Sequence, residues 1–141
     1  ENSENKDEVI PKTNFSNPLK TIYFKYIKRL DPYSKEAVEE LLSKFKNNVS
    51  LIKGNSNSLL KKIDMSKIDY VFLDGGHDYL TVINDLNCCK EVIENNGTVI
   101  CDDYDLTYAP GVKKAIDEFI NQNNFKFRIL WNSRFAKIEK N

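Results

Sequence analysis

Side chains that could do chemistry follow two apolar stretches of the chain. One stretch ends in Asp74, and the only histidine, His77, comes three positions later; the second ends in the adjacent carboxylates Asp102 and Asp103. In an open parallel sheet, ligands bind at the carboxyl ends of the strands, so we expect these four side chains to converge there. Three carboxylates and an imidazole suit a hard divalent cation such as Mg²⁺ or Mn²⁺, with the imidazole as a base beside it.

Each of these residues also has a plain structural interpretation. Asp74 could cap a turn, although the two glycines after it let the backbone turn sharply and leave room for a ligand. His77 could be a hydrogen-bonded structural histidine or a proton-transfer group, since imidazole exchanges protons near neutral pH. Asp102 and Asp103 could lie in a solvated turn, but adjacent carboxylates repel unless a cation or hydrogen-bond donors neutralise them, which favours a metal or ligand site.

Further polar residues have two interpretations that the sequence does not separate. Asp31 follows a strand-like stretch, where an acid often binds ribose hydroxyls, but Asp31-Pro32 is also a good helix start. Tyr104, Asp105 and Tyr108 could line the site or cover the edge of the sheet.

The composition favours a single domain with small-molecule or protein partners. A chain of 141 residues is long enough for one hydrophobic core and too short for two ordinary domains. Its 21 basic and 21 acidic side chains cancel, and no segment concentrates Lys and Arg as nucleic-acid binding requires. We therefore expect no nucleic-acid partner.

The sequence indicates neither a membrane segment nor a disulfide framework. No apolar run approaches the ~20 residues that span a bilayer, and the first residues lack the apolar core of a signal peptide. Cys88, Cys89 and Cys101 are odd in number and lack C-x-x-C spacing, so we expect buried reduced thiols. These features predict a soluble, cytoplasmic protein with no membrane partner.

The elements that must position these residues alternate between strand and helix. Residues 1–20 are polar and without periodicity, which predicts an irregular or partly disordered arm before a domain at 21–141. Within that domain we expect strands at 22–27, 49–53, 70–73 and 98–101. We expect one helix that begins at Asp31-Pro32 and three others at 59–63, 79–94 and 112–120. A hairpin of 125–131 and 135–138 should follow them.

This order of elements predicts an α/β fold. Its sheet is expected to be Rossmann-like and mostly parallel, with helices on its faces and an antiparallel hairpin at the carboxyl end. The helix at 79–94 has the clearest pattern, and Asn95-Asn96-Gly97 provides its stop. Its expected buried residues are Val82, Ile83, Leu86 and Ile93, and its expected exposed residues are Asn84, Asn87 and Glu91.

The segment from about 49 to 119 resembles the class I S-adenosylmethionine-dependent methyltransferases. Within that class it is similar to the metal-dependent small-molecule and sugar O-methyltransferases of the macrocin type. The resemblance covers roughly half of the chain. It is carried by Leu51-Ile-Lys-Gly-Asn-Ser, Asp69-Tyr-Val-Phe-Leu-Asp-Gly-Gly-His, Asp85-Leu, Asn96-Gly-Thr-Val-Ile, Asp102-Asp-Tyr and Gly111-Val-Lys-Lys-Ala-Ile-Asp-Glu-Phe.

The resemblance implies roles for the acidic and imidazole side chains. Asp74, Asp102 and Asp103 would hold Mg²⁺ or Mn²⁺, and His77 would deprotonate the hydroxyl group of the acceptor. The metal would act as a Lewis acid and as a template that aligns the acceptor with the methyl donor.

The resemblance also implies a cofactor site, with two departures. Asp31 would contact the ribose of S-adenosylmethionine, Asn55 stands where the family often has an aspartate near the adenine, and Asp74 would also face the cofactor. The glycine-rich loop that approaches the methionine moiety has no counterpart, since all five glycines lie in other motifs. The chain thus resembles the carboxyl-terminal two-thirds of the fold, and we expect it to bind the donor poorly or not at all. Its incomplete sheet would expose an edge, which the segment 21–30 or a second copy of the chain would cover.

The function that the resemblance implies is divalent-metal-assisted O-methylation of a small hydroxylated molecule, of which a sugar is one candidate. The alternative is a truncated, non-catalytic binding module with the same fold, and binding of S-adenosylmethionine separates the two. A metal-dependent phosphoesterase is a third interpretation of Asp74-Gly75-Gly76-His77-Asp78. Dinuclear hydrolase sites draw on several histidines, however, and this chain has one.

Overall fold

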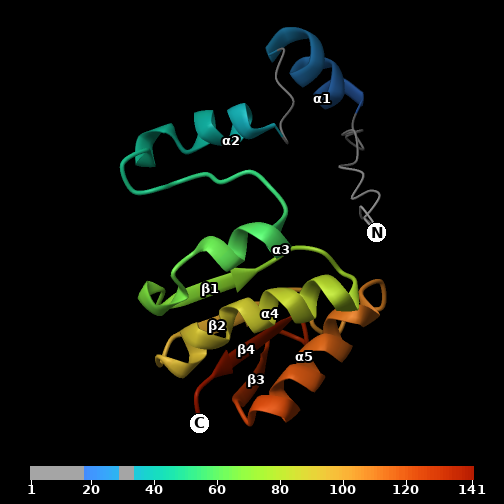
Figure 1. The fold of residues 1–141 in the computed structure, drawn as a ribbon. Coiled ribbons are helices and arrows are strands. Elements are labelled where there is room, and N and C mark those ends of the chain that lie inside the picture. Colours follow the sequence, from blue (N-terminus) through green and yellow to red (C-terminus); the bar gives the residue numbers. More distant parts are fainter. Residues whose placement is uncertain (1–17, 29–33) are drawn as a thin grey trace, which may run out of the picture. The chain divides into compact units, whose positions relative to one another are not determined.

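The structure, a computed structural model, describes residues 18–28 and 34–141 (Figure 1). The chain divides into two compact units, 1–53 and 54–141. The second unit holds the sheet, the two long helices and all of the predicted site residues except Asp31, which lies outside the described residues.

Four strands form one sheet in the order β1-β2-β4-β3. β1 runs parallel to β2, whereas β4 is antiparallel to both β2 and β3. The strands are β1 (Tyr70–Leu73), β2 (Thr98–Cys101), β3 (Lys126–Leu130) and β4 (Phe135–Glu139). The predicted α/β Rossmann-like fold and its carboxyl-terminal antiparallel hairpin are confirmed. The sheet of the described residues is not mostly parallel, however, because the strands expected at 22–27 and 49–53 are absent from it; one of its three pairings is parallel and two are antiparallel.

The two faces of the sheet differ in burial. Val99 of β2 pairs with Ile138 of β4, and neither side chain has exposed surface. On the opposite face of β1, Tyr70 and Phe72 are 78% and 56% exposed. The core therefore lies on one side of the sheet, where strand residues alternate between the core and the other face.

Two long helices form the other half of this core, α4 (Tyr79–Glu94) and α5 (Pro110–Asn123). They pack against each other, and α4 also contacts β1 and β2. α5 begins with Pro110 at its first position, where a missing N–H costs no hydrogen bond. Its buried side chains are Val112, Ala115, Ile116 and Phe119.

The bounds predicted for α4 are confirmed, and so is the prediction of which face of the helix is buried. Asp78 caps its first turn, with its Oδ1 atom accepting a hydrogen bond of 3.0 Å from the Thr81 N–H. Asn96, with a φ of 68°, provides the left-handed residue that follows the last turn. Val82, Leu86 and Ile93 are buried and Ile83 is half-buried, while Asn84, Asn87 and Glu91 are exposed.

Short helical turns lead from the boundary between the units to β1. They are α3 (Ser56–Leu59), η3 (Leu60–Lys62) and η4 (Met65–Lys67). Met65 is the buried residue of this stretch, and the predicted short helix near 59–63 corresponds to α3 and η3.

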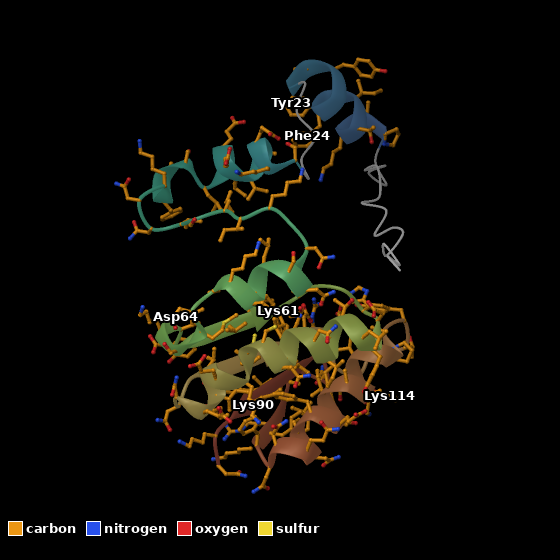
Figure 2. All side chains as sticks on the ribbon, in the orientation of Figure 1. Tyr23, Phe24, Lys61, Asp64, Lys90 and Lys114 are labelled. Carbon is orange, nitrogen blue, oxygen red and sulfur yellow. The ribbon has the colours of Figure 1, made fainter. Side chains whose placement is uncertain are left out.

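The amino-terminal unit differs from the prediction. Its described elements are α1 (Pro18–Ile22), η1 (Tyr23–Lys28), α2 (Lys35–Leu41) and η2 (Ser43–Phe45). The predicted strand at 22–27 is wrong, because apolar residues occupy both phases of this segment and the chain forms local helical hydrogen bonds instead. Tyr23 and Phe24 lie in this helical segment (Figure 2).

Two further predictions for this unit need correction. Residues 49–53 are not a strand, because no strand of the described residues pairs with them. The helix expected to start at Asp31-Pro32 has its described start at Lys35, where the Ser34 hydroxyl accepts a hydrogen bond of 3.2 Å from the Ala37 N–H. The pair Asp31-Pro32 itself lies outside the described residues.

The outer edge of β1 carries no partner strand among the described residues. The expectation that 21–30 would fill this edge as a strand is wrong for 21–28, which is helical. In the part of the chain that the structure describes, no helix combines the length and the apolar character needed to cross a membrane.

Candidate functional site

The carboxyl ends of β1 and β2 lie side by side. Leu73, the last residue of β1, pairs with Cys101, the last residue of β2. The Asp102 N–H then donates a hydrogen bond of 2.9 Å to the Leu73 carbonyl oxygen. The parallel register therefore keeps the segments that follow the two strands adjacent, as the sequence pattern predicts.

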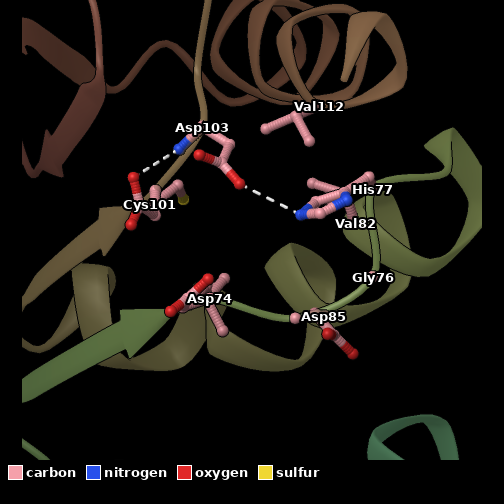
Figure 3. Close-up of a pocket in the computed structure, with 11 residues that line it drawn as sticks. Asp74, Gly76, His77, Val82, Asp85, Cys101, Asp103 and Val112 are labelled. Carbon is pink, nitrogen blue, oxygen red and sulfur yellow. Dashed lines mark hydrogen bonds and ion pairs between the residues drawn. The ribbon is translucent and has the colours of Figure 1, made fainter. Parts of the chain in front are cut away.

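One small pocket is lined by Asp74, His77, Asp102 and Asp103 (Figure 3). Its cavity volume is ≈ 20 Å³, about the room that one water molecule needs. A single hydroxyl group fits such a space, and the rest of a substrate would lie outside it. The expected convergence of these residues is present, while their roles stay predictions.

His77 and Asp103 form a pair inside this pocket. The His77 Nε2 atom lies 3.0 Å from Asp103 Oδ2. Because an ionised carboxylate only accepts hydrogen bonds, Nε2 carries a proton in this contact, and in the neutral imidazole Nδ1 is then the acceptor. The Asp103 side chain is 9% exposed and that of His77 is 49% exposed. The orienting carboxylate is thus shielded, while the imidazole remains accessible to a substrate.

Tyr108 supports both members of this pair. Its hydroxyl donates a hydrogen bond of 2.7 Å to Asp103 Oδ1, and this bond raises the pKa of Tyr108. Its ring meets the His77 ring edge-on, with 5.8 Å between the centroids. The sequence left open whether Tyr108 lines the site or covers the sheet edge, and the structure brings it to the site.

The backbone of Asp103 has an uncommon conformation. Its φ is 58°, in the left-handed region that non-glycine residues rarely adopt. The Asp103 N–H donates a hydrogen bond of 2.7 Å to Asp102 Oδ1, which stabilises this turn. The turn directs the two adjacent carboxylates to different partners, so they do not compete for one donor.

Asp102 is bound by Arg134, a residue that the sequence analysis did not select. The Arg134 Nε and Nη2 atoms donate hydrogen bonds of 2.8 and 2.9 Å to Asp102 Oδ1 and Oδ2. Such a two-point contact fixes the relative orientation of both groups. The hydrogen bonds from Arg134 hold the pKa of Asp102 below its usual range. The Asp102 side chain is 7% exposed and that of Arg134 is 53% exposed.

Arg134 could not be selected because its place depends on the sheet order. The hairpin itself was predicted, but β4 could have paired elsewhere. Pairing of Cys101 in β2 with Ala136 in β4 is what brings the residues before Ala136 to the end of β2. One sequence feature could have indicated Arg134. It is a basic residue directly before a predicted strand, and that strand could pair with the strand that ends just before Asp102.

Gly111 positions the segment that carries His77. A Cβ atom at Gly111 would lie 2.7 Å from both the His77 carbonyl oxygen and the Tyr79 nitrogen, which is closer than such atoms approach. The start of α5 can therefore pack against this segment only without a side chain at this position. At Gly75 a Cβ would meet Asp85 Oδ2 at 3.8 Å, an ordinary contact, so space does not require glycine there.

The cysteines are free thiols, as expected. Cys89 and Cys101 are buried and Cys88 is half-buried. Burial raises the pKa of Cys101, which lines the pocket, to about 12. Its thiol stays protonated near neutral pH, so it is a poor nucleophile.

The predicted metal ligands do not form a ready metal site in this arrangement. Among the described residues, no three His, Cys, Asp or Glu side chains are placed to hold one ion. Arg134 takes both oxygens of Asp102, and His77 and Tyr108 take those of Asp103. Asp74 is exposed at the pocket rim. The donor set as it stands does not fit a divalent cation.

The predicted cofactor residues are only partly described. Asp31 lies outside the described residues. Asn55 caps α3, with its Oδ1 atom accepting a hydrogen bond of 2.9 Å from the Asn57 N–H. Asp74 lies at the end of β1 and borders the pocket. Contact of these residues with a cofactor stays a prediction.

The fold and this strand-end site define the chain as an α/β domain of the class I methyltransferase type. The profile of a family described as a methyltransferase domain matches residues 13–104. The chain belongs to this family of methyltransferase domains.

Among the proteins similar to the chain are one of known structure and one viral protein. The O-methyltransferase NovP has a similar structure, with a TM-score of 0.56 and 17% identity, over 93% of this chain and 54% of that chain. At this identity the likeness shows the fold. An uncharacterized protein, R132, of Acanthamoeba polyphaga mimivirus is 37% identical over 54 residues, which are 38% of this chain and 24% of that protein. The chain thus spans about half of the similar structure and about a quarter of the viral relative.

Proposed function

We propose that this domain carries the acceptor side of an S-adenosylmethionine-dependent O-methyltransferase. The observation that supports this function best is the pairing of His77 with Asp103, at 3.0 Å, at the carboxyl end of the sheet. A base held by a shielded carboxylate in this position is suited to remove a proton from a hydroxyl group. The proposed acceptor is a small hydroxylated molecule, and a sugar is one candidate.

The proton transfer follows from the assigned tautomer. The Nδ1 atom of His77 takes the hydroxyl proton, while the Nε2 proton remains hydrogen-bonded to Asp103 Oδ2. The imidazolium that forms is stabilised by the negative charge of Asp103. The acceptor oxygen forms a bond to carbon as the bond between that carbon and the sulfonium sulfur breaks. When bound, S-adenosylmethionine would supply this methyl carbon, with S-adenosylhomocysteine as the leaving group.

The residues proposed to hold the methyl donor are Asp31, Asn55 and Asp74, by resemblance to the family. Asn55 offers a polar side chain at the start of α3, and Asp74 borders the pocket that contains His77. The proposed donor would therefore approach the pocket from the β1 side.

The proposed methylation was also expected to be assisted by Mg²⁺ or Mn²⁺. By resemblance, Asp74, Asp102 and Asp103 would hold the ion, which would supply Lewis-acid chemistry. Because Asp102 and Asp103 are fully engaged by other side chains in this arrangement, the proposed proton transfer uses no step through a metal.

The test combines donor binding with methyl transfer. Calorimetry with S-adenosylhomocysteine shows whether the chain binds the donor product, and labelled S-adenosylmethionine with a panel of hydroxylated acceptors shows transfer. His77→Ala should lower kcat by ~10²–10⁴ with little change in donor affinity. The matched control is Asp105→Asn, because Asp105 pairs with Lys113 at 2.9 Å and not with His77.

Two results would contradict the proposal. An unchanged rate in His77→Ala would return His77 to a structural role. A chain that binds no donor product and transfers no methyl group to any acceptor would support the non-catalytic binding module instead.

A further inference from the structure

Arg134 binds one of the carboxylates to which the family resemblance assigns a divalent cation. Its guanidinium binds both oxygens of Asp102, one of the three expected metal ligands, at 2.8 and 2.9 Å. Asp102 is nearly buried, so its charge needs a partner at this position. A guanidinium supplies a permanent positive charge with fork geometry that matches a carboxylate.

The backbone also fixes the position of Arg134. The Tyr104 N–H donates a hydrogen bond of 2.8 Å to the Arg134 carbonyl oxygen, and the Asp105 N–H donates one of 3.1 Å to Ser133. These two bonds join the β3–β4 turn to the loop that carries Asp102. The turn and the loop therefore form one connected structure.

The β3–β4 turn, which leads directly into Arg134, has an uncommon backbone conformation. Trp131, Asn132 and Ser133 have φ values of 49°, 50° and 68°, so three successive non-glycine residues are left-handed. Such residues persist only where the surrounding structure holds them. The Arg134 Cζ atom lies 5.2 Å from the centroid of the Phe135 ring, and Trp131 stacks on the same ring. These contacts limit the freedom of the guanidinium.

Two of the three expected metal ligands, Asp102 and Asp103, then have side-chain partners without an added ion. Arg134 neutralises Asp102, and Asp103 receives hydrogen bonds from His77 and Tyr108. A divalent cation at these carboxylates would have to displace Arg134 or lie beside its positive charge, which is unfavourable.

We propose that Arg134 is the resident cation of the acceptor site, so that Asp102 and Asp103 work with a guanidinium in place of a divalent metal. This inference rests on the proposed function for its chemical meaning. Arg134 acts through Asp102 and the turn that follows it, so it is a positioning residue for the pair of His77 and Asp103.

Calorimetric titration of the whole chain with MgCl₂ and with MnCl₂ tests the proposal. The unaltered chain should show no saturable binding in the micromolar range. Arg134→Met keeps much of the apolar stem of the side chain but removes the charge. It should raise the affinity for Mn²⁺ by about 10- to 100-fold, the size of the change in metal affinity when groups that contact metal ligands are altered. The matched control, Arg128→Met, changes an exposed arginine of β3 and should leave metal affinity as it is.

The outcomes separate this inference from the proposed function. Micromolar binding of either ion to the unaltered chain would overturn it, even if Arg134→Met fails to fold. Equal metal affinity of a folded Arg134→Met and the unaltered chain would also overturn it. Because the titration needs no methyl transfer, a rate that is insensitive to His77→Ala would refute the proposed function and leave this result in place. Where transfer is measurable, chelation by EDTA should leave its rate unchanged.

Discussion

The two units of the chain differ most in what their apolar side chains contact. In the unit 54–141, Leu86, Phe119 and Ile138 have no exposed surface. In the described part of the unit 1–53, no side chain is buried, and Leu41 and Phe45 are 78% and 56% exposed. Both units contain helices, but among the described residues only those of the second unit form a buried core. Stability and the site should both depend on the second unit.

The largest expected effect compares one phenylalanine in each unit. Phe119→Ala should lower the free energy of unfolding by ~3–5 kcal/mol, because it removes a fully buried ring and leaves a cavity. Phe45→Ala should change it by less than about 0.5 kcal/mol, as exposed positions do. Urea unfolding of both variants measures the difference. Similar losses would show that the amino-terminal unit is part of the cooperative core.

The next effect concerns the contact between α5 and the segment of His77. Gly111→Ala places a Cβ 2.7 Å from two backbone atoms, so the segment must shift. We expect a loss of ~1–3 kcal/mol in stability and, through displacement of His77, about a 10²-fold loss in methyl transfer.

The control for Gly111 is Gly75→Ala. Its Cβ would make an ordinary contact at 3.8 Å, so unfolding in urea should be nearly unaffected. If both variants lose the same stability, close packing is not what selects glycine at position 111.

A smaller effect is expected from the pH dependence of stability. Arg134 holds the pKa of Asp102 below its usual range, so the charged form stabilises the fold above the unfolded pKa of about 3.9. This contribution is lost as the pH falls through the lower pKa of the folded state. Because Arg134 is 53% exposed, we expect about 1 kcal/mol or less.

Urea unfolding between about pH 2 and about pH 6 measures this contribution. Asp102→Asn should show a shallower fall in stability over the acidic range than the unaltered chain. Parallel curves for the two proteins would mean that the pair of Asp102 and Arg134 does not couple to folding.

The same contrast explains how far the sequence could predict the structure. β1, β2 and α4 have their predicted bounds because local pattern, end signals and burial agree there. The segments 22–27 and 49–53 were expected to be strands, but no neighbouring strand of the described residues pairs with them. Strand formation depends on a partner that the local pattern does not reveal.

The site shows the same limit at the level of side chains. Asp74, His77, Asp102 and Asp103 could be placed together because the ends of parallel strands meet at one edge. Arg134 reaches the site through the pairing of β4 with β2, a long-range contact that the local pattern alone does not establish. The predicted acidic residues thus line one pocket, with their roles still predictions, while the group that neutralises Asp102 was missed.

The most direct test of the account is the coupling between His77 and Asp103 in methyl transfer. If Asp103 acts only by orienting and stabilising His77, the double variant His77→Gln/Asp103→Asn should be about as slow as His77→Gln alone, which should lose ~10²–10⁴ in kcat. Losses that multiply in the double variant would mean that the two residues act independently, and would contradict the pairing on which the proposed function rests.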